Sequence, residues 1–249
     1  MNSPNNPRVV IVAITRHGVK LAARLAQDLP EAELLIAEKF TTETPALSNP
    51  KRFYSGALRD EIGGLFEQFD QIIFLVSLGA VVRLIAPHLR NKEVDPGITV
   101  VDDAGEFAIP VLSGHVGGAN AYAQRVADIL DARAVVTTAS DVGKTIPVDI
   151  LGRELDWQVE APKINITRVS AHVVNGEMIA FVQEHGARQW WTRTTALPPN
   201  IHLFDDINAV DLNKFRAVLW VTRRVIDSEW WLRLPERLVV YRPPLGQDK

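Results

Sequence analysis

Apolar and polar residues along the first half of the chain alternate between two patterns. Short, almost wholly apolar runs rich in β-branched residues are typical of parallel strands covered on both faces. Such runs occupy residues 8–14, 33–37, 71–76, 98–101, 107–112 and 134–138. Apolar residues at helical spacing predict helices within 21–29, 58–66, 81–89 and 122–130. Strands that alternate with helices indicate an α/β fold, a mainly parallel sheet flanked by helices on both faces.

Polar stretches divide these elements and mark a change of pattern after Asp141. Residues 39–56 are rich in Thr, Pro, Ser and Asn and predict a loop, and 102–105 predict a hairpin-like turn. Beyond Asp141 we expect a short helix near 148–157. Short alternating segments then predict strands at 165–174, 178–182, 202–204, 217–222 and 238–241. We therefore expect an α/β domain with Gly-rich ligand loops at 1–141 and a smaller, strand-rich α/β domain at 142–249.

Composition narrows the classes of function. A chain of 249 residues with 47% hydrophobic content can bury a core. Because cysteine is absent, disulfides, thiolate metal sites and a cysteine nucleophile are excluded, and the histidines lack metal-ligand spacing. The net charge of −3 argues against nucleic-acid partners. No apolar stretch approaches roughly 18 residues and no leader pattern is present, so we expect a cytoplasmic protein without a membrane partner.

Three loops that follow predicted strands are candidates for ligand binding, at 15–18, 77–83 and 113–120. Open parallel sheets bind ligands beyond the carboxyl ends of their strands, so we expect the three loops to converge. The loop at 113–120 is the most informative, because its glycines allow a close approach of backbone to ligand. The first N–H groups of the helix that follows suit a carboxylate or phosphate. Plain turn geometry is the alternative explanation of the glycines.

Individual side chains in these regions have a functional and a structural interpretation. His115 is either a general acid or base or a structural hydrogen-bonding group. Ser113 is not in the Gly-x-Ser-x-Gly context of a nucleophile, so we expect it to cap the turn or bind substrate. Arg83, one turn after Gly79, is placed to bind a carboxylate through two parallel hydrogen bonds, unless it is merely solvated.

Two further features favour a structural interpretation. Asp102 and Asp103 offer carboxylates for catalysis, but adjacent aspartates in a hairpin are usually turn formers. The pairs Trp190–Trp191 and Trp230–Trp231 suit either a partner surface or the core of the second domain, and we favour the core.

Several motifs follow one another in a fixed order, at residues 77–87, 95–96, 100–105, 112–120 and 137–141. Together they resemble the cobalt-precorrin-5A hydrolase family of cobalamin biosynthesis. The resemblance implies hydrolysis of the δ-lactone of a cobalt-precorrin tetrapyrrole, with loss of acetaldehyde, to give cobalt-precorrin-5B. The cobalt is carried by the substrate, so no cofactor and no metal bound by the protein is implied. Such chemistry needs a water-activating base, donors for the oxyanion and an acid.

On this resemblance we assign hypothetical roles to eight residues. His115 is the expected catalytic acid or base. The other residues are expected to bind the substrate, the loop glycines through backbone donors and Arg83 and Asn120 through carboxylates or amides: Gly79, Arg83, Ser113, Gly114, Gly117, Gly118 and Asn120.

Two other functions stay open at this stage. Family members commonly carry a further C-terminal domain, whereas this sequence stops at Lys249. That domain is either dispensable, supplied by another protein, or lost together with activity. A non-catalytic tetrapyrrole-binding or channelling subunit with a separate C-terminal-domain partner is therefore one alternative. An α/β enzyme for an unrelated anionic metabolite is the other.

Overall fold

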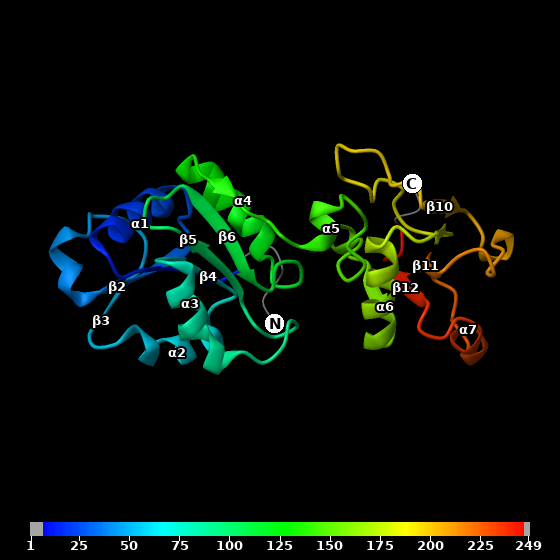
Figure 1. Ribbon diagram of the computed structural model, residues 1–249, viewed down its shortest axis with the longest axis horizontal. Coiled ribbons are helices and arrows are strands. Elements are labelled where there is room, and N and C mark those ends of the chain that lie inside the picture. The colour runs from blue at the N-terminus through cyan, green and yellow to red at the C-terminus, as the bar shows by residue number, and fades with distance from the viewer. Residues whose placement is uncertain (1–6, 247–249) are drawn as a thin grey trace. The chain divides into compact units, whose positions relative to one another are not determined.

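The computed structural model describes residues 7–246 and divides the chain into two compact units, Met1–Thr137 and Thr138–Lys249. Each unit contains one β-sheet with its own helices (Figure 1). Within the described residues, no helix is both long and apolar enough to cross a membrane.

The first unit is built on a seven-stranded sheet in the order β3-β2-β1-β4-β5-β6-β7. Its strands are β1 Val9–Ala13, β2 Ala32–Ala37, β3 Lys51–Tyr54, β4 Gln71–Leu75, β5 Gly97–Val101, β6 Phe107–Leu112 and β7 Arg133–Ala134. The strands from β1 to β5 are parallel, whereas β6 is antiparallel to β5 and β7 is parallel to β6. The carboxyl ends of β6 and β7 therefore lie at the opposite edge of the sheet from those of the first five strands.

Helices cover both faces of this sheet, which confirms the predicted fold class. They are α1 Arg16–Asp28, α2 Ile62–Gln68, α3 Leu78–Ile85 and α4 Ala119–Leu130. Alternate side chains of a strand point to opposite faces. Accordingly Val9 and Ile11 of β1 are buried in the cluster that holds α1 and α4, and Val10 and Val12 in the cluster that holds α2 and α3.

The second unit has a five-stranded sheet in the order β10-β9-β11-β12-β8, in which only β8 is antiparallel. Its strands are β8 Gln158–Glu160, β9 Ile179–Gln183, β10 Ile201–Phe204, β11 Ala217–Val221 and β12 Leu238–Arg242. Its helices are α5 Ala139–Val142, α6 Lys163–Val174 and α7 Ser228–Arg233. Both faces of the sheet are buried, in two clusters that contain residues of this unit alone.

Four predicted elements differ from the structure. The strand expected at 134–138 is only the two-residue β7 at Arg133–Ala134. Residues 165–174 belong to helix α6, because Asn165, Val169 and Val173 are buried at a spacing of four. Residues 148–157 form turns with only a 3-10 segment at Arg153–Leu155, since Gly152 has a φ of 73°. The predicted loop at 39–56 contains β3 and part of the 3-10 segment Glu38–Glu43. Other 3-10 segments are Leu58–Asp60, Ala86–His88 and Ile207–Ala209.

The paired tryptophans pack against the core of the second unit, as expected. Trp190 stacks on Phe181 with ring centroids 4.1 Å apart, and Trp191 packs against the same cluster. Trp230 lies 5.0 Å from buried Trp220, edge to face, and Trp231 packs on that side of the sheet. Aromatic pairs in this geometry stabilise a core beyond the area they bury.

Candidate functional site

The loops after β1 and β4 adjoin one another at the carboxyl edge of the first sheet. The chain passes from β1 to β2 on one side and from β4 to β5 on the other, so the boundary between β1 and β4 is a topological switch point. Open α/β sheets bind ligands at such a point. The close fit is visible at Gly18, where an added Cβ would lie 3.1 Å from the carbonyl oxygen of Leu75.

The side chain of Thr15 links the loop after β1 to the hairpin at 102–105. Its hydroxyl oxygen accepts the N–H of Gly18 (2.9 Å) and so caps α1, and its hydroxyl donates to Oδ1 of Asp103 (3.0 Å). Asp102 accepts the N–H groups of Ala104, Glu106 and Phe107 and thereby shapes the hairpin. The structural interpretation of Asp102 as a turn former is confirmed, and Asp103 joins the turn to the start of α1.

Gly79 and Arg83 lie together on the first two turns of α3, and both are exposed. The guanidinium Nη1 of Arg83 donates to the carbonyl oxygen of Gly79 at 2.9 Å. The arginine therefore folds back on its own helix at the switch point. Its expected contact with a substrate carboxylate stays a prediction.

The Gly-rich loop, residues 113–120, lies at the opposite edge of the sheet from the switch point, where β4 and β5 begin. It follows β6, and an added Cβ on Gly97, the first residue of β5, would lie 2.7 Å from the carbonyl oxygen of Gly117. Gln71, the first residue of β4, donates its Nε2 to that same carbonyl. A five-residue strand such as β4 spans about 17 Å at roughly 3.3 Å per residue. The expectation that all three loops converge is therefore wrong, because the hairpin at 102–105 reverses β6.

The backbone of the Gly-rich loop is strained and folded on itself. Ser113, a non-glycine residue, has a φ of 52°, and its buried hydroxyl has no hydrogen-bond partner among the described residues. The N–H groups of Gly118, Ala119 and Asn120 donate to carbonyl oxygens of His115, Ser113 and Gly114 at 3.0, 3.2 and 3.0 Å. The first N–H groups of α4 are thus used within the loop. In this conformation the N–H of Gly118 bonds to the carbonyl of His115, and its expected contact with a ligand stays a prediction.

Close packing surrounds two of the glycines. A Cβ on Gly114 would lie 2.6 Å from Oδ1 of Asn120, and one on Gly117 would lie 2.4 Å from Cβ of Ser113. At Gly117 the neighbours include backbone atoms of Ser113 and Gly97, so this position requires glycine whatever the loop binds, whereas a Cβ on Gly114 would only displace the side chain of Asn120. His115 is half-buried in the same loop. The structure thus brings together Ser113, Gly114, His115, Gly117, Gly118 and Asn120, and separates them from Gly79 and Arg83.

Sequence reasoning missed Gln71, which positions the Gly-rich loop. The side chain is 4% exposed, and its amide lies between Gly97 and Gly117 and close to Gly118. A polar residue at the head of an otherwise apolar strand is the signal that could have found it. Asp95 lies two residues before β5, is 7% exposed and accepts the N–H of Arg90, which holds the segment leading to Gly97.

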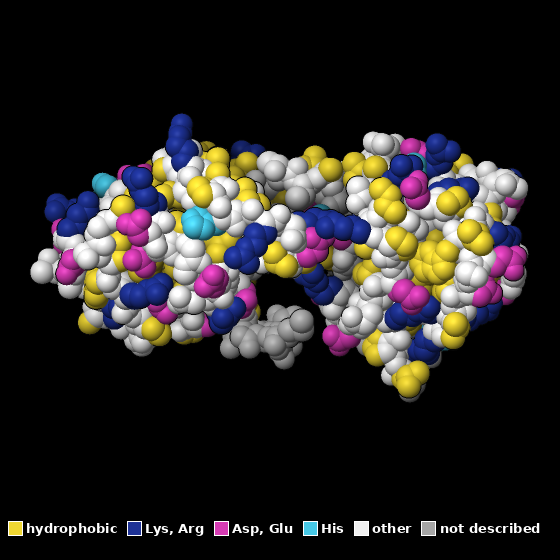
Figure 2. Space-filling view, turned by 90° about the horizontal axis from the view of Figure 1, so that it is seen from below, with side chains coloured by type: hydrophobic (Ala, Val, Ile, Leu, Met, Phe, Trp, Pro, Cys, Tyr) yellow, Lys and Arg dark blue, Asp and Glu magenta, His cyan; other side chains and the backbone are white. Residues whose placement is uncertain are grey.

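Among residues 7–246, no cluster of three or more His, Asp or Glu side chains is placed to hold a metal ion. On the face drawn in Figure 2, basic and acidic side chains are interspersed over the described residues of each unit.

Comparison with known families identifies the family to which this chain belongs. The family model for the cobalamin synthesis G N-terminal region matches residues 60–141, and the model for the cobalamin biosynthesis central region matches residues 146–243. The chain belongs to the cobalamin synthesis G family. The first of these matches includes the loops at 77–83 and 113–120 but not the loop at 15–18, and the second covers almost all of the second unit.

Members of this family with assigned activities are similar over most of the chain. A cobalt-precorrin-5A hydrolase from Priestia megaterium is 44% identical over 233 residues, which are 94% of this chain and 62% of the relative. The Salmonella typhimurium enzyme of the same name is 28% identical over 222 residues, 88% of this chain and 56% of the relative. The chain thus spans about three fifths of the length of these relatives.

A solved structure described as a cobalamin biosynthesis protein G homolog from Sulfolobus solfataricus is 18% identical. The match has a TM-score of 0.49 and covers 96% of this chain and 61% of that one.

Proposed function

We propose that this protein opens the δ-lactone of cobalt-precorrin-5A by hydrolysis and releases acetaldehyde, giving cobalt-precorrin-5B. The observation that carries the proposal is the 44% identity to a cobalt-precorrin-5A hydrolase across 94% of the chain. The cobalt enters with the substrate, so the protein's own side chains need only bind the macrocycle and move protons. With this function the protein acts in the cytoplasm, and the molecule that it binds is the cobalt-precorrin tetrapyrrole.

The Gly-rich loop is our candidate for the chemical step. Strained non-glycine backbone and buried hydroxyls without partners collect at active sites, and Ser113 combines the two. His115 is the one side chain of residues 113–120 that exchanges a proton near neutral pH. When water attacks the lactone carbonyl it loses a proton, and the ring C–O bond breaks to leave an alkoxide. The alkoxide electrons form the C=O of acetaldehyde as its bond to the macrocycle breaks, and the macrocycle, which keeps that electron pair, gains a proton. One imidazole serves both transfers, first as base and then as acid.

The switch point between β1 and β4 is assigned a separate role in holding the periphery of the substrate. Gly79 and Arg83 lie there, and Arg83 can bind a carboxylate once its terminal nitrogen leaves the carbonyl of Gly79. Because the two loop groups lie at opposite edges, a change at Arg83 should raise KM more than it lowers kcat. A change at His115 should do the reverse.

The experiment measures acetaldehyde release from cobalt-precorrin-5A by the purified chain. We expect His115→Gln to lower kcat by about 100-fold or more while corrinoid binding is retained, since general acid-base groups contribute roughly 10² to 10⁴. His88→Gln is the matched control, because its ring is also half-buried in the first unit and packs near Phe66. Wild-type turnover by the His115 variant would refute its role. Corrinoid binding by the wild type without any acetaldehyde would favour a non-catalytic binding subunit.

A further inference from the structure

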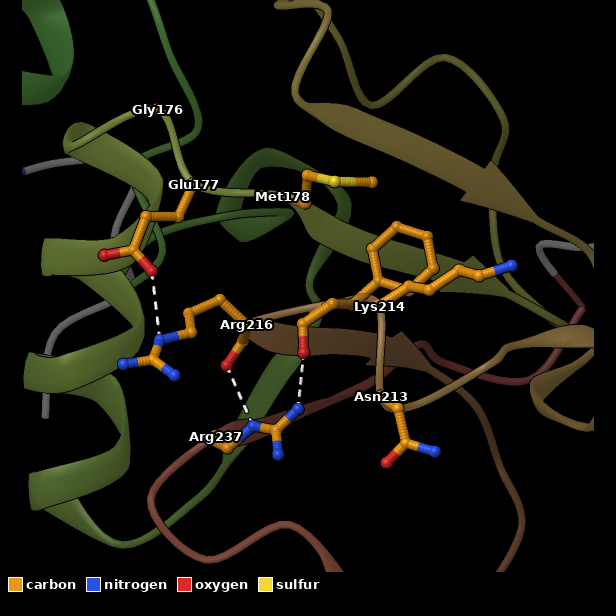
Figure 3. Close-up of a pocket in the computed structure, with 8 residues that line it drawn as sticks. Gly176, Glu177, Met178, Asn213, Lys214, Arg216 and Arg237 are labelled. Atoms are coloured by element: carbon orange, nitrogen blue, oxygen red, sulfur yellow. Dashed lines mark hydrogen bonds and ion pairs between the residues drawn. The ribbon is translucent and has the colours of Figure 1, made fainter.

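Two adjoining pockets lie at the amino edge of the second sheet, where β9, β11 and β12 begin. The larger has a volume of about 480 Å³ and is lined from residues 176–178, 213–216 and 237 (Figure 3). The smaller, of about 280 Å³, lies against α6 and residues 235–237. Arg216 and Arg237 line both pockets, so their side chains form a shared wall.

Hydrogen bonds and an ion pair hold both arginine side chains in place, and some of their guanidinium N–H groups stay available to a ligand. Arg237 donates from Nε to the carbonyl of Arg216 and from Nη2 to that of Leu212, both at 2.9 Å, and also to that of Phe215. Nε of Arg216 pairs with Oε2 of Glu177 at 3.1 Å (Figure 3). Among the described residues, Nη1 of Arg237 and both terminal nitrogens of Arg216 make no further hydrogen bond. A guanidinium has five N–H donors in a fixed fork that matches a carboxylate.

The charge of the lining is positive although the chain carries −3 overall. Together the pockets are lined by Arg168, Lys214, Arg216 and Arg237 and by two carboxylates, so the balance is 4 − 2 = +2. In the smaller pocket, Nη1 of Arg168 forms an ion pair with Oε2 of Glu236, 2.6 Å away. Figure 3 shows Lys214 extending away from both arginines of the shared wall, so the guanidinium groups carry the recognition.

The shared wall concentrates like charges. Burial lowers the pKa of Arg237, and the neighbouring charge of Arg216 lowers it further. A bound anion would offset the repulsion from Arg216, since it supplies a counter-charge beside the two guanidinium groups.

We propose that the two pockets bind two carboxylate groups of one organic polyanion, with Arg216 and Arg237 between them. The identity of that ligand rests on the proposed function: the peripheral carboxylates of the tetrapyrrole substrate fit two lobes that share a basic wall. A single small anion would occupy one lobe and leave the other unused.

The test uses the full chain and a metal-free porphyrin octacarboxylate, which has no lactone and is not turned over. Its fluorescence is titrated against the wild type and against the double variant Arg168→Gln with Arg216→Gln. We expect binding of the double variant to be at least about tenfold weaker, because the charge-assisted hydrogen bonds to Arg216 and the positive charge of Arg168 in the smaller pocket are lost. Arg237 is kept, because its bonds to three carbonyls hold the pocket together.

Arg188→Gln is the matched control. It removes another arginine of the same unit, paired with exposed Asp205 at 2.8 Å, and should change binding by less than about twofold. Equal porphyrin affinity of the double variant and the wild type would overturn the proposal, as would equal weakening by the control. Competition supplies a second readout: a tricarboxylate should displace the porphyrin at lower concentration than inorganic phosphate, and the reverse order would overturn the assignment to carboxylates.

The proposed function and this pocket can fail separately. If the wild type binds porphyrin through these arginines but releases no acetaldehyde from cobalt-precorrin-5A, the hydrolase function fails and the pocket stands. If acetaldehyde is released and the double variant keeps the wild-type affinity for the porphyrin, the pocket assignment fails and the hydrolase function stands.

Discussion

Gly117 shows at the scale of one residue why the Gly-rich loop cannot accept another side chain. An added Cβ would lie 2.4 Å from Cβ and 2.8 Å from the carbonyl oxygen of Ser113. We expect Gly117→Ala to lower the free energy of unfolding by about 1–3 kcal/mol, the usual cost of overpacking, as measured by urea denaturation.

Gly63→Ala is the control for that measurement. The position lies in α2, and an added Cβ would meet only the ring of His88 at 3.5 Å, an ordinary contact. Alanine is a better helix former than glycine, so stability should stay the same or rise by up to about 1 kcal/mol. Equal destabilisation by the two variants would show that packing in the loop is not the cause.

Asp70 gives the first unit a pH-dependent contribution to stability. Its side-chain hydrogen bond with Arg8, with Nη2 and Oδ1 3.0 Å apart, lowers the pKa of the carboxyl group. The stabilisation is therefore complete above the unfolded pKa of about 3.9 and is lost as the pH falls through the folded value. Urea denaturation should show a larger free energy of unfolding for the wild type than for Asp70→Asn at pH 7. This difference should shrink below about pH 4. A difference that does not change with pH would contradict this account.

At the scale of elements, Thr15 determines how α1 begins beside the switch point. Its oxygen caps the helix at the N–H of Gly18, and its hydroxyl reaches Asp103. Thr15→Ala should lower the free energy of unfolding by about 1 kcal/mol, as loss of an N-cap does. Thr167→Ala is the control, because that exposed hydroxyl bonds, among the described residues, only to the carbonyl of Lys163 within helix α6. Two variants of equal stability would argue against a capping role.

Elements with a strong apolar pattern could be predicted, and those with a mixed pattern could not. The runs that became β1, β4 and β5 are buried throughout, so composition alone identified them. Helix α6 was mistaken for a strand because Asn165 is polar yet buried, donating Nδ2 to the carbonyl of Leu238 at 2.9 Å. That bond pairs residues 73 positions apart, which no local pattern reveals.

At the scale of the whole molecule, each unit has a core of its own, and no core cluster of described residues draws on both. All six tryptophans, at 157, 190, 191, 220, 230 and 231, belong to the second unit. Tryptophan fluorescence therefore reports on that unit, whereas far-UV circular dichroism reports on both. In Gly117→Ala we expect the dichroism transition in urea to move to lower concentration while the fluorescence transition stays in place. A matching shift of both signals would show that the units unfold together.

The sequence by itself determined the alternation of strands and helices, burial on both faces of the sheet, and a loop at 113–120 that tolerates few side chains. These follow from the period of apolar residues and from glycine content, which are local properties. Only the tertiary structure decided the strand order that creates the switch point between β1 and β4, because that order depends on pairing between strands remote in the chain. The hairpin at 102–105 reversed β6 and placed His115 at the opposite edge from Arg83. Likewise, Arg216 and Arg237 share a wall only because β11 and β12 pair in parallel and begin at the same edge.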